Sequence, residues 1–103
     1  MQSTKKNQVI HVNDIESLLG KIDLIDIREP YEYERGSIQT AKNIPMGDLL
    51  ENPANYLDKA KTYHIMCQSG GRSAMACQIL SSNGYQVIDV AGGFGSYVGT
   101  KKN

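Results

Sequence analysis

Residues 63–83, with the sequence YHIMCQSGGRSAMACQILSSN, decide the fold of this chain. They begin as an apolar run that ends at Cys67, pass through a small polar turn with two adjacent glycines, and continue as a helical pattern over 73–83. A short apolar run followed by a glycine-containing turn favours a buried strand, and the apolar spacing after the turn favours a helix. The segment therefore predicts a strand, a tight turn and a helix in direct succession.

The same alternation of extended and helical patterns continues along the chain. Extended segments are predicted at 8–11, 22–27, 41–45, 63–66 and 86–90. Helical segments are predicted at 13–19, 30–35, 46–50, 54–60, 73–83 and 94–98. In the first of these helices, Asn13 is the expected N-cap and Glu16 completes a pair that resembles a capping box. Strands that alternate with helices indicate a parallel sheet covered on both faces, with ligands beyond the carboxyl ends of the strands.

Composition narrows the classes of function. The 103 residues fit one domain, which we place at 8–100, between a flexible N-terminus at 1–7 and a C-terminal tail at 101–103. Lysine plus arginine and aspartate plus glutamate balance at 11 each, which argues against a nucleic-acid partner. The sequence shows neither an apolar run of roughly 18 residues nor a secretory h-region, so no membrane partner is expected. Two cysteines are too few for a disulfide scaffold, and reduced thiols favour a cytoplasmic location.

The turn after Cys67 contains the parts that activate a thiol. Glycines permit positive φ, so the amides of 68–71 can turn inward and form a nest for an anion. The N-terminus of the following helix adds a partial positive charge, and Arg72 adds a full one. All three effects favour the thiolate, which is the nucleophilic form of cysteine. The competing interpretation is an inert cysteine buried at a strand end, but the Gly-Gly-Arg-Ser continuation into a helix favours a reactive site.

Four motifs follow one another along the chain. They are 25–45 (IDIREPYEYERGSIQTAKNIP), 67–73 (CQSGGRS), Asn83-Gly84-Tyr85 and Ala91-Gly92-Gly93. Together they resemble the single-domain rhodanese family of sulfurtransferases, over about 9–98. The resemblance implies a three-layer α/β domain with a central, mostly parallel five-stranded sheet flanked by helices.

The resemblance also implies a mechanism and a set of site residues. Cys67 would attack the outer sulfur of a small anionic donor such as thiosulfate and become a persulfide. A thiophilic acceptor, such as cyanide or a cellular dithiol like thioredoxin, would then remove that sulfur. No metal or organic cofactor is needed, because the cysteine itself holds the sulfur. The loop that would hold the donor and the persulfide is Gln68, Ser69, Gly70, Gly71 and Arg72.

Three functions compete on this basis. The first is a turnover enzyme, and the second is a persulfide carrier or sensor that gives its sulfur to one protein partner. The third is a phosphate or arsenate enzyme, but related domains of that kind use a loop one residue longer. The span from Cys67 to Arg72 is six residues, and this smaller ring suits a bound sulfur better than a tetrahedral oxyanion. Sulfur transfer is therefore favoured.

Several further residues have two interpretations each. Asp26 and Arg28 match the family's acidic-x-arginine pattern at a strand end. They either shape the field of the loop or only tie the strand end to a neighbouring segment, and the structural role is favoured. Ser37 stands where the family often has histidine, which leaves the local packing open. Gly93-Phe94-Gly95 lacks the third glycine of a dinucleotide fingerprint, because position 98 is Val98, so nucleotide binding is rejected.

The remaining candidates have mainly structural interpretations. Glu29 and Glu32 are expected on a solvated face. Cys77 is expected to pack within its helix rather than to act as a resolving thiol. Tyr97 stands where the family often has tryptophan, and we expect a core anchor whose hydroxyl needs a partner. His64 is expected to be a core histidine with its hydrogen bonds satisfied.

Overall fold

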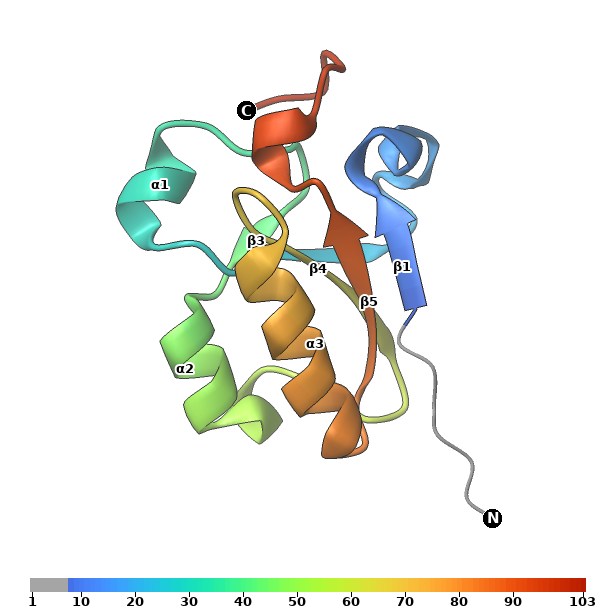
Figure 1. Cartoon of the computed structure of the whole chain (residues 1–103), viewed down its shortest axis with the longest axis vertical. Helices are drawn as coiled ribbons and strands as arrows, with labels where there is room; N and C mark the ends of the chain where they lie inside the picture. The colour runs from blue at the N-terminus through green and yellow to red at the C-terminus, as the bar shows by residue number, and fades with distance from the viewer. Residues whose placement is uncertain (1–7) are drawn as a thin grey trace.

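The computed structural model describes residues 8–103, which contain one sheet of five strands (Figure 1). The expected N-terminal segment, 1–7, lies outside these residues. The strands are β1 (Gln8–His11), β2 (Asp23–Asp26), β3 (Lys42–Asn43), β4 (Thr62–Met66) and β5 (Gln86–Ala91). Their order is β1-β5-β4-β2-β3, and every pairing is parallel. The expected sheet class is confirmed, and the carboxyl ends of the strands meet at one edge.

Helical elements cover both faces of the sheet. The helices are α1 (Pro30–Glu34), α2 (Met46–Glu51) and α3 (Gly71–Ser82), and the 3-10 turns are η1 (Val12–Asp14), η2 (Glu16–Leu18), η3 (Pro53–Asn55) and η4 (Phe94–Ser96). Figure 1 shows α2 and α3 side by side on one face of the sheet, where Leu49 and Leu80 join Ile65 in one buried cluster. A second cluster, which includes Val12 and Val90, lies on the other face. The two clusters lie between the sheet and the helical elements on either side of it, so the domain has three layers.

The predicted helix at 13–19 is wrong. The chain forms the two short turns η1 and η2 instead, and the side chain of Asn13 does not cap them. Its Nδ2 donates to the carbonyl of Ser96 at 2.9 Å, and its Oδ1 accepts from the amide of Val98 at 2.9 Å. His11 Nδ1 takes the capping role by accepting from the amide of Asn13. Asn13 thus joins the N-terminal turns to the C-terminal segment.

The C-terminal residues pack along the chain that follows α1. Ile38 and Lys102 form an antiparallel bridge, and the amide of Asn103 donates to the carbonyl of Ser37 at 2.9 Å. The segments at 54–60 and 94–98 contain only the 3-10 turns η3 and η4 rather than the predicted helices. Within residues 8–103, no helix is both long enough and apolar enough to cross a membrane.

Candidate active site

The turn between β4 and α3 places a thiol at the start of a helix. Cys67 directly follows β4, and α3 begins at Gly71. Gly70 is the N-cap and has a φ of 104°, a left-handed conformation that residues with a side chain disfavour. Gly71 was also expected to have a positive φ, but it is the first helical residue and its φ is not positive. One glycine, not two, therefore turns the loop.

The sulfur of Cys67 is fully buried and surrounded by hydrogen-bond donors. The amide of Gly70 donates to Sγ at 3.1 Å and the amide of Ser73 at 3.3 Å, while Oγ of Ser73 lies 3.5 Å away. Burial raises the pKa of the thiol, but the hydroxyl of Ser73 and the amides of Ser73, Gly70 and Ser69 outweigh it, so the pKa of Cys67 is lowered. Because Cys67 is 0% exposed, its sulfur is closed to solvent in this conformation of the loop.

The glycine segment after β5 supports the backbone of the thiol loop. The amide of Phe94 donates to the carbonyl of Cys67, and the amide of Gly95 donates to the carbonyl of Gln68, both at 2.9 Å. Gly93 has a φ of 64°, and a Cβ on it would lie 2.6 Å from the carbonyl carbon and oxygen of Gln68. These glycines therefore serve close approach to the loop, which gives a structural reason for the motif that resembled a nucleotide fingerprint.

Asp26 and Arg28 form a buried network behind the loop. Asp26 is fully buried and accepts from the Nη2 of Arg28 at 2.8 Å and from the hydroxyl of Ser37 at 2.7 Å. Arg28 also donates from Nη1 to Oε1 of Gln68 at 2.9 Å and from Nη2 to the carbonyl of Gly36 at 2.7 Å. The network ties the end of β2 to the segment after α1, and it also holds the side chain of the first loop residue. Ser37, where the family often has histidine, contributes to this network.

Arg72 forms an ion pair away from the thiol. Its Nη1 and Nη2 lie 2.9 Å and 3.1 Å from the two carboxylate oxygens of Glu32. The expectation that Glu32 belongs to a solvated face is therefore wrong, because its side chain is only 20% exposed. The hydrogen bond with Arg72 lowers the pKa of Glu32 to about 2. The same contact raises the pKa of Arg72, so both charges persist at neutral pH.

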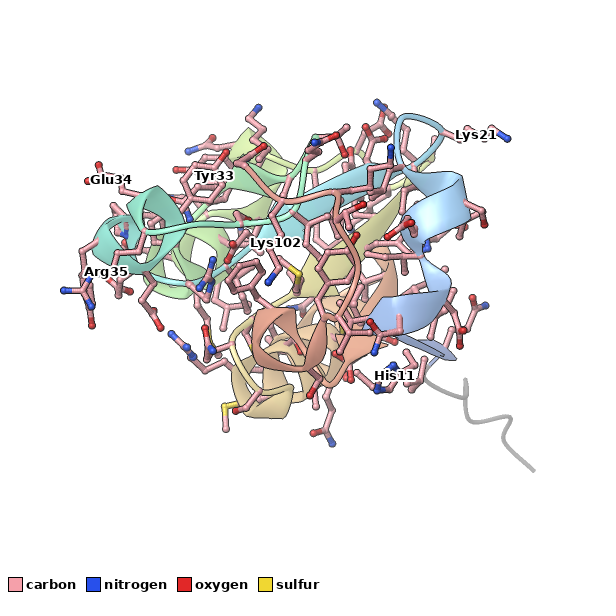
Figure 2. The ribbon with its side chains drawn as sticks, turned by 90° about the horizontal axis from the view of Figure 1, so that it is seen from above. His11, Lys21, Tyr33, Glu34, Arg35 and Lys102 are labelled. Atoms are coloured by element: carbon pink, nitrogen blue, oxygen red, sulfur yellow. The ribbon has the colours of Figure 1, made fainter. Side chains whose placement is uncertain are left out.

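A hollow with charged residues in its lining lies beside the loop. Its volume is about 300 Å³, and it is lined by Arg28, Tyr31, Glu32, Arg35, Gly36, Gln68 and Phe94. The Phe94 ring centroid lies 4.7 Å from the guanidinium carbon of Arg28 and 5.5 Å from the Nζ of Lys102. Figure 2 shows Lys102 near the middle of the view from above and Arg35 at its left edge. Arg35 and Lys102 add positive charge at or near this hollow, whereas Arg28 is paired with Asp26 and Glu32 with Arg72.

Two buried residues of the site were not identified from the sequence. The hydroxyl of Ser73 donates to Oδ1 of Asp89 at 2.6 Å, and Asp89 is only 7% exposed. The available signals were a serine directly after Arg72 in the loop motif and a lone carboxylate inside the apolar strand 86–91. Buried polar groups need hydrogen-bond partners, so each residue was expected to form a contact, but the sequence did not identify the partner.

The structural expectations have mixed outcomes. Cys77 is 2% exposed, and burial raises its pKa to about 12, as expected for a packed thiol. Tyr97 is buried, as expected, and its hydroxyl contacts the carboxylate of Glu16 and the amide of Lys101. His64 is buried, as expected, but its Nδ1 has no hydrogen-bond partner, so the expectation that its hydrogen bonds are satisfied is wrong. Burial lowers the pKa of His64 and keeps it neutral.

Comparisons with known proteins agree with the geometry. The Rhodanese-like domain family matches residues 11–100. The chain is 40% identical over 79 residues to YtwF of Bacillus subtilis, provisionally named a sulfurtransferase, covering 77% of this chain and 76% of that protein. It is 39% identical over 70 residues to the thiosulfate sulfurtransferase PspE of Escherichia coli, covering 67% of each. The crystal structure of a rhodanese-like domain protein from Staphylococcus aureus superposes with a TM-score of 0.82 at 28% identity, covering 93% of this chain and 96% of that one. This chain therefore belongs to the rhodanese-like domain family, because its sequence and its fold both match and a thiol lies between a parallel strand and the start of a helix.

Proposed function

We propose that this chain is a sulfurtransferase that moves a sulfane sulfur from an anionic donor such as thiosulfate to a thiophilic acceptor through a persulfide on Cys67. The observation that supports this most directly is the hydrogen bonding of the Cys67 sulfur by the amides of Gly70 and Ser73 at the start of α3. These donors lower the pKa of the thiol despite its burial. Two of the relatives described above are named sulfurtransferases, one of them provisionally.

The chemistry has two displacement steps. The Cys67 thiolate attacks the outer sulfur of thiosulfate, the bond between the two donor sulfurs breaks, and sulfite leaves with that electron pair. Cyanide or a dithiol such as reduced thioredoxin then attacks the terminal sulfur of the persulfide. The bond to Cys67 breaks, and its electron pair returns to Cys67 as the thiolate. No electrons enter or leave the protein in either step with cyanide as the acceptor.

The loop residues have distinct roles in this proposal. The amides of the loop from Gln68 to Arg72 hold the persulfide, and Gly70 presents its amide because of its positive φ. Arg72 binds the anionic part of the donor by exchanging the carboxylate of Glu32 for it. Arg28 fixes Gln68 from behind without touching the donor. A cytoplasmic location is part of the proposal, because a reducing compartment keeps Cys67 as a free thiol.

Intact-mass measurement tests the proposal. The protein is incubated with thiosulfate and is expected to gain one sulfur atom, which cyanide or reduced thioredoxin then removes. Cys67→Ala abolishes the gain, whereas Cys77→Ala retains it. If the wild-type protein gains no sulfur, the proposal is wrong. Loading followed by slow release to small acceptors would favour the carrier, and phosphate-ester turnover faster than sulfur loading would favour the third function.

A further inference from the structure

Ser73 connects the nucleophile to a buried carboxylate. Its hydroxyl oxygen lies 2.6 Å from Oδ1 of Asp89 and 3.5 Å from Sγ of Cys67. Ser73 and Cys67 are 0% exposed, and Asp89 is 7% exposed. The sheet sets this arrangement, because Asp89 on β5 pairs in register with Ile65 on β4, and Cys67 follows Ile65 on the same face. The three groups form a row that is closed to solvent.

The hydroxyl of Ser73 has a single proton and three possible acceptors, which are Asp89 at 2.6 Å, the carbonyl of Gly70 at 3.2 Å and the sulfur of Cys67 at 3.5 Å. An ionised Asp89 accepts that proton, and the lone pair of the Ser73 oxygen then faces the Cys67 thiol and accepts its S–H. A Cys67 thiolate accepts from the amides of Gly70 and Ser73 and attracts the hydroxyl proton of Ser73 as a third donor, and Asp89 would then lose that proton while charged and buried. A concerted movement of two protons keeps the hydrogen bonds from Cys67 to Ser73 and from Ser73 to Asp89 in both states of the thiol.

We propose that Asp89 accepts the proton of Cys67 through Ser73. The S–H bond of Cys67 breaks, its proton bonds to the oxygen of Ser73, and the former hydroxyl proton of Ser73 moves to Oδ1 of Asp89. The S–H electron pair stays on sulfur, so a thiol and a carboxylate become a thiolate and a carboxylic acid with no change in net charge. Asp89 touches no substrate in this step. It is a positioning residue for the proton, and the inference rests on the proposed function because Cys67 is the nucleophile there.

The environment of Asp89 makes it a stronger base than an exposed carboxylate. Burial raises the pKa of Asp89, and this effect exceeds the opposing effect of the hydrogen bond from Ser73. Cys77 on α3 stays protonated, because burial and the charges of Asp89 and Cys67 raise its pKa to about 12. It therefore does not compete for the proton.

We call the proton path from Cys67 through Ser73 to Asp89 the relay. The remaining charged and titratable neighbours of Asp89 do not provide another acceptor or ion-pair partner for it. Arg72 at the start of α3 is paired with Glu32. The strand register places His11 of β1 and Tyr63 of β4 on the same sheet face as Asp89. Among residues 8–103, no lysine, arginine or histidine forms an ion pair with Asp89. A carboxylate without a cation partner is ready to take up a proton.

The relay gives Cys67 a distinctive pH dependence. The thiol–carboxylate and thiolate–acid forms bind the same number of protons, so their ratio is independent of pH, and these two forms dominate between the two apparent pKa values of the pair. The rate of Cys67 alkylation by iodoacetamide is therefore expected to stay constant over this interval in the wild-type protein. Without the relay, the rate falls by about tenfold for each pH unit below the thiol pKa.

Two variants interrupt the relay at different atoms. Asp89→Asn keeps an acceptor for the Ser73 hydroxyl but does not take up the proton, and Ser73→Ala removes the bridge. Both are expected to change the flat profile into one that falls by about tenfold per pH unit. The slope is the readout, because Asp89→Asn also removes a negative charge near the sulfur and so changes the rate at any single pH. Asp23→Asn, at an exposed carboxylate of β2, and Ser82→Ala, at the far end of α3, are matched controls that keep the flat profile.

The outcomes separate this inference from the proposed function. A tenfold-per-unit slope in the wild-type protein overturns the relay, and this measurement needs no variant to fold. A flat profile in folded Asp89→Asn overturns it as well. Thiosulfate loading is followed by intact mass in the same series. If thiosulfate loads the wild-type protein but the alkylation rate falls by about tenfold per pH unit, the proposed function is retained and the relay is rejected. If the alkylation rate is constant but no sulfur is loaded, the relay is retained and the proposed function is rejected.

Discussion

The guanidinium of Arg72 and the carboxylate of Glu32 form two parallel hydrogen bonds, 2.9 Å and 3.1 Å long, across 40 positions of sequence. Arg72 lies in the first turn of α3, and Glu32 lies in α1. The charge that the thiol loop offers to an anionic donor is therefore already neutralised before the donor arrives. In the proposed function, the donor has to displace a carboxylate of the protein itself.

Glu32→Gln is expected to tighten donor binding. Without the competing charge, the KM for thiosulfate falls by about fivefold, which corresponds to about 1 kcal/mol for a partly exposed ion pair. The rate of loading at saturating donor changes little, because Glu32 does not contact Cys67. Steady-state kinetics measure both quantities. Glu34→Gln is the control, since Glu34 is exposed on the same helix (Figure 2), and a raised KM in Glu32→Gln would contradict the expectation.

The same ion pair predicts a dependence of stability on pH. Hydrogen bonding to Arg72 lowers the pKa of Glu32 to about 2 in the folded protein. A carboxyl whose folded pKa is depressed stabilises the fold above its unfolded pKa of about 4.3, and this contribution is lost as the pH falls towards about 2. Urea denaturation across this range is expected to show a loss of about 1 kcal/mol in the wild-type protein that Glu32→Gln lacks. Equal losses in both proteins would contradict the assignment.

Gly93→Ala is expected to weaken both the fold and sulfur loading. A Cβ at this position would lie 2.6 Å from the carbonyl of Gln68, and the φ of 64° disfavours a side chain. The expected loss in the free energy of unfolding is about 3 kcal/mol. The thiol loop moves with it, so loading by thiosulfate slows as well. Gly47→Ala in α2 is the matched control, because nothing lies within 4 Å of its Cβ, and it is expected to gain about 0.5 kcal/mol.

The two cysteines are expected to differ in reactivity. Hydrogen bonds lower the pKa of Cys67, whereas burial raises that of Cys77 to about 12. Iodoacetamide at about pH 8 should therefore modify Cys67 alone in the folded protein and both thiols in urea. Peptide mass mapping distinguishes the sites. Modification of Cys77 at the same rate as Cys67 would show that the difference in environment has no chemical effect.

His64→Leu is expected to flatten the stability profile near neutral pH. Burial lowers the pKa of His64, so the unfolded chain binds a proton that the folded chain does not. Wild-type stability therefore decreases as the pH falls through the unfolded value of about 6.5. Leucine removes this dependence, and it also removes the unpaired Nδ1, which gives about 1 kcal/mol of stability at neutral pH. Urea titrations at several pH values test this, and an unchanged slope would refute it.

Local chemistry made much of the fold and the loop predictable. The strand before Cys67 and the helix after it depend on apolar spacing and glycine, which are properties of neighbouring residues. The structure has both elements, with α3 covering Gly71–Ser82 where 73–83 was predicted. Buried parallel strands are continuous apolar runs, so the other central strands were also identifiable.

The contacts that the sequence did not reveal join residues far apart. Glu32 looked like an exposed acid on a short helix, and only the packing of α1 near α3 pairs it with Arg72. Asp89 looked like an isolated charge until the register of β5 placed it beside Ser73. Asn13 had the signature of an N-cap, but its side chain forms tertiary hydrogen bonds instead. In each case a distant partner outweighed the local preference.

The complete burial of Cys67 has a consequence for damage by oxidants. A low-pKa thiolate in contact with solvent is readily converted by peroxide to sulfenic acid and then irreversibly to sulfinic and sulfonic acids. Here the sulfur is 0% exposed and lies beneath the amides of its own loop. Peroxide therefore meets the same barrier as the sulfur donor, and the closed protein keeps its thiol intact under conditions that would inactivate an open one. In the proposed function, both the sulfur donor and peroxide therefore need the loop to open before they reach the sulfur.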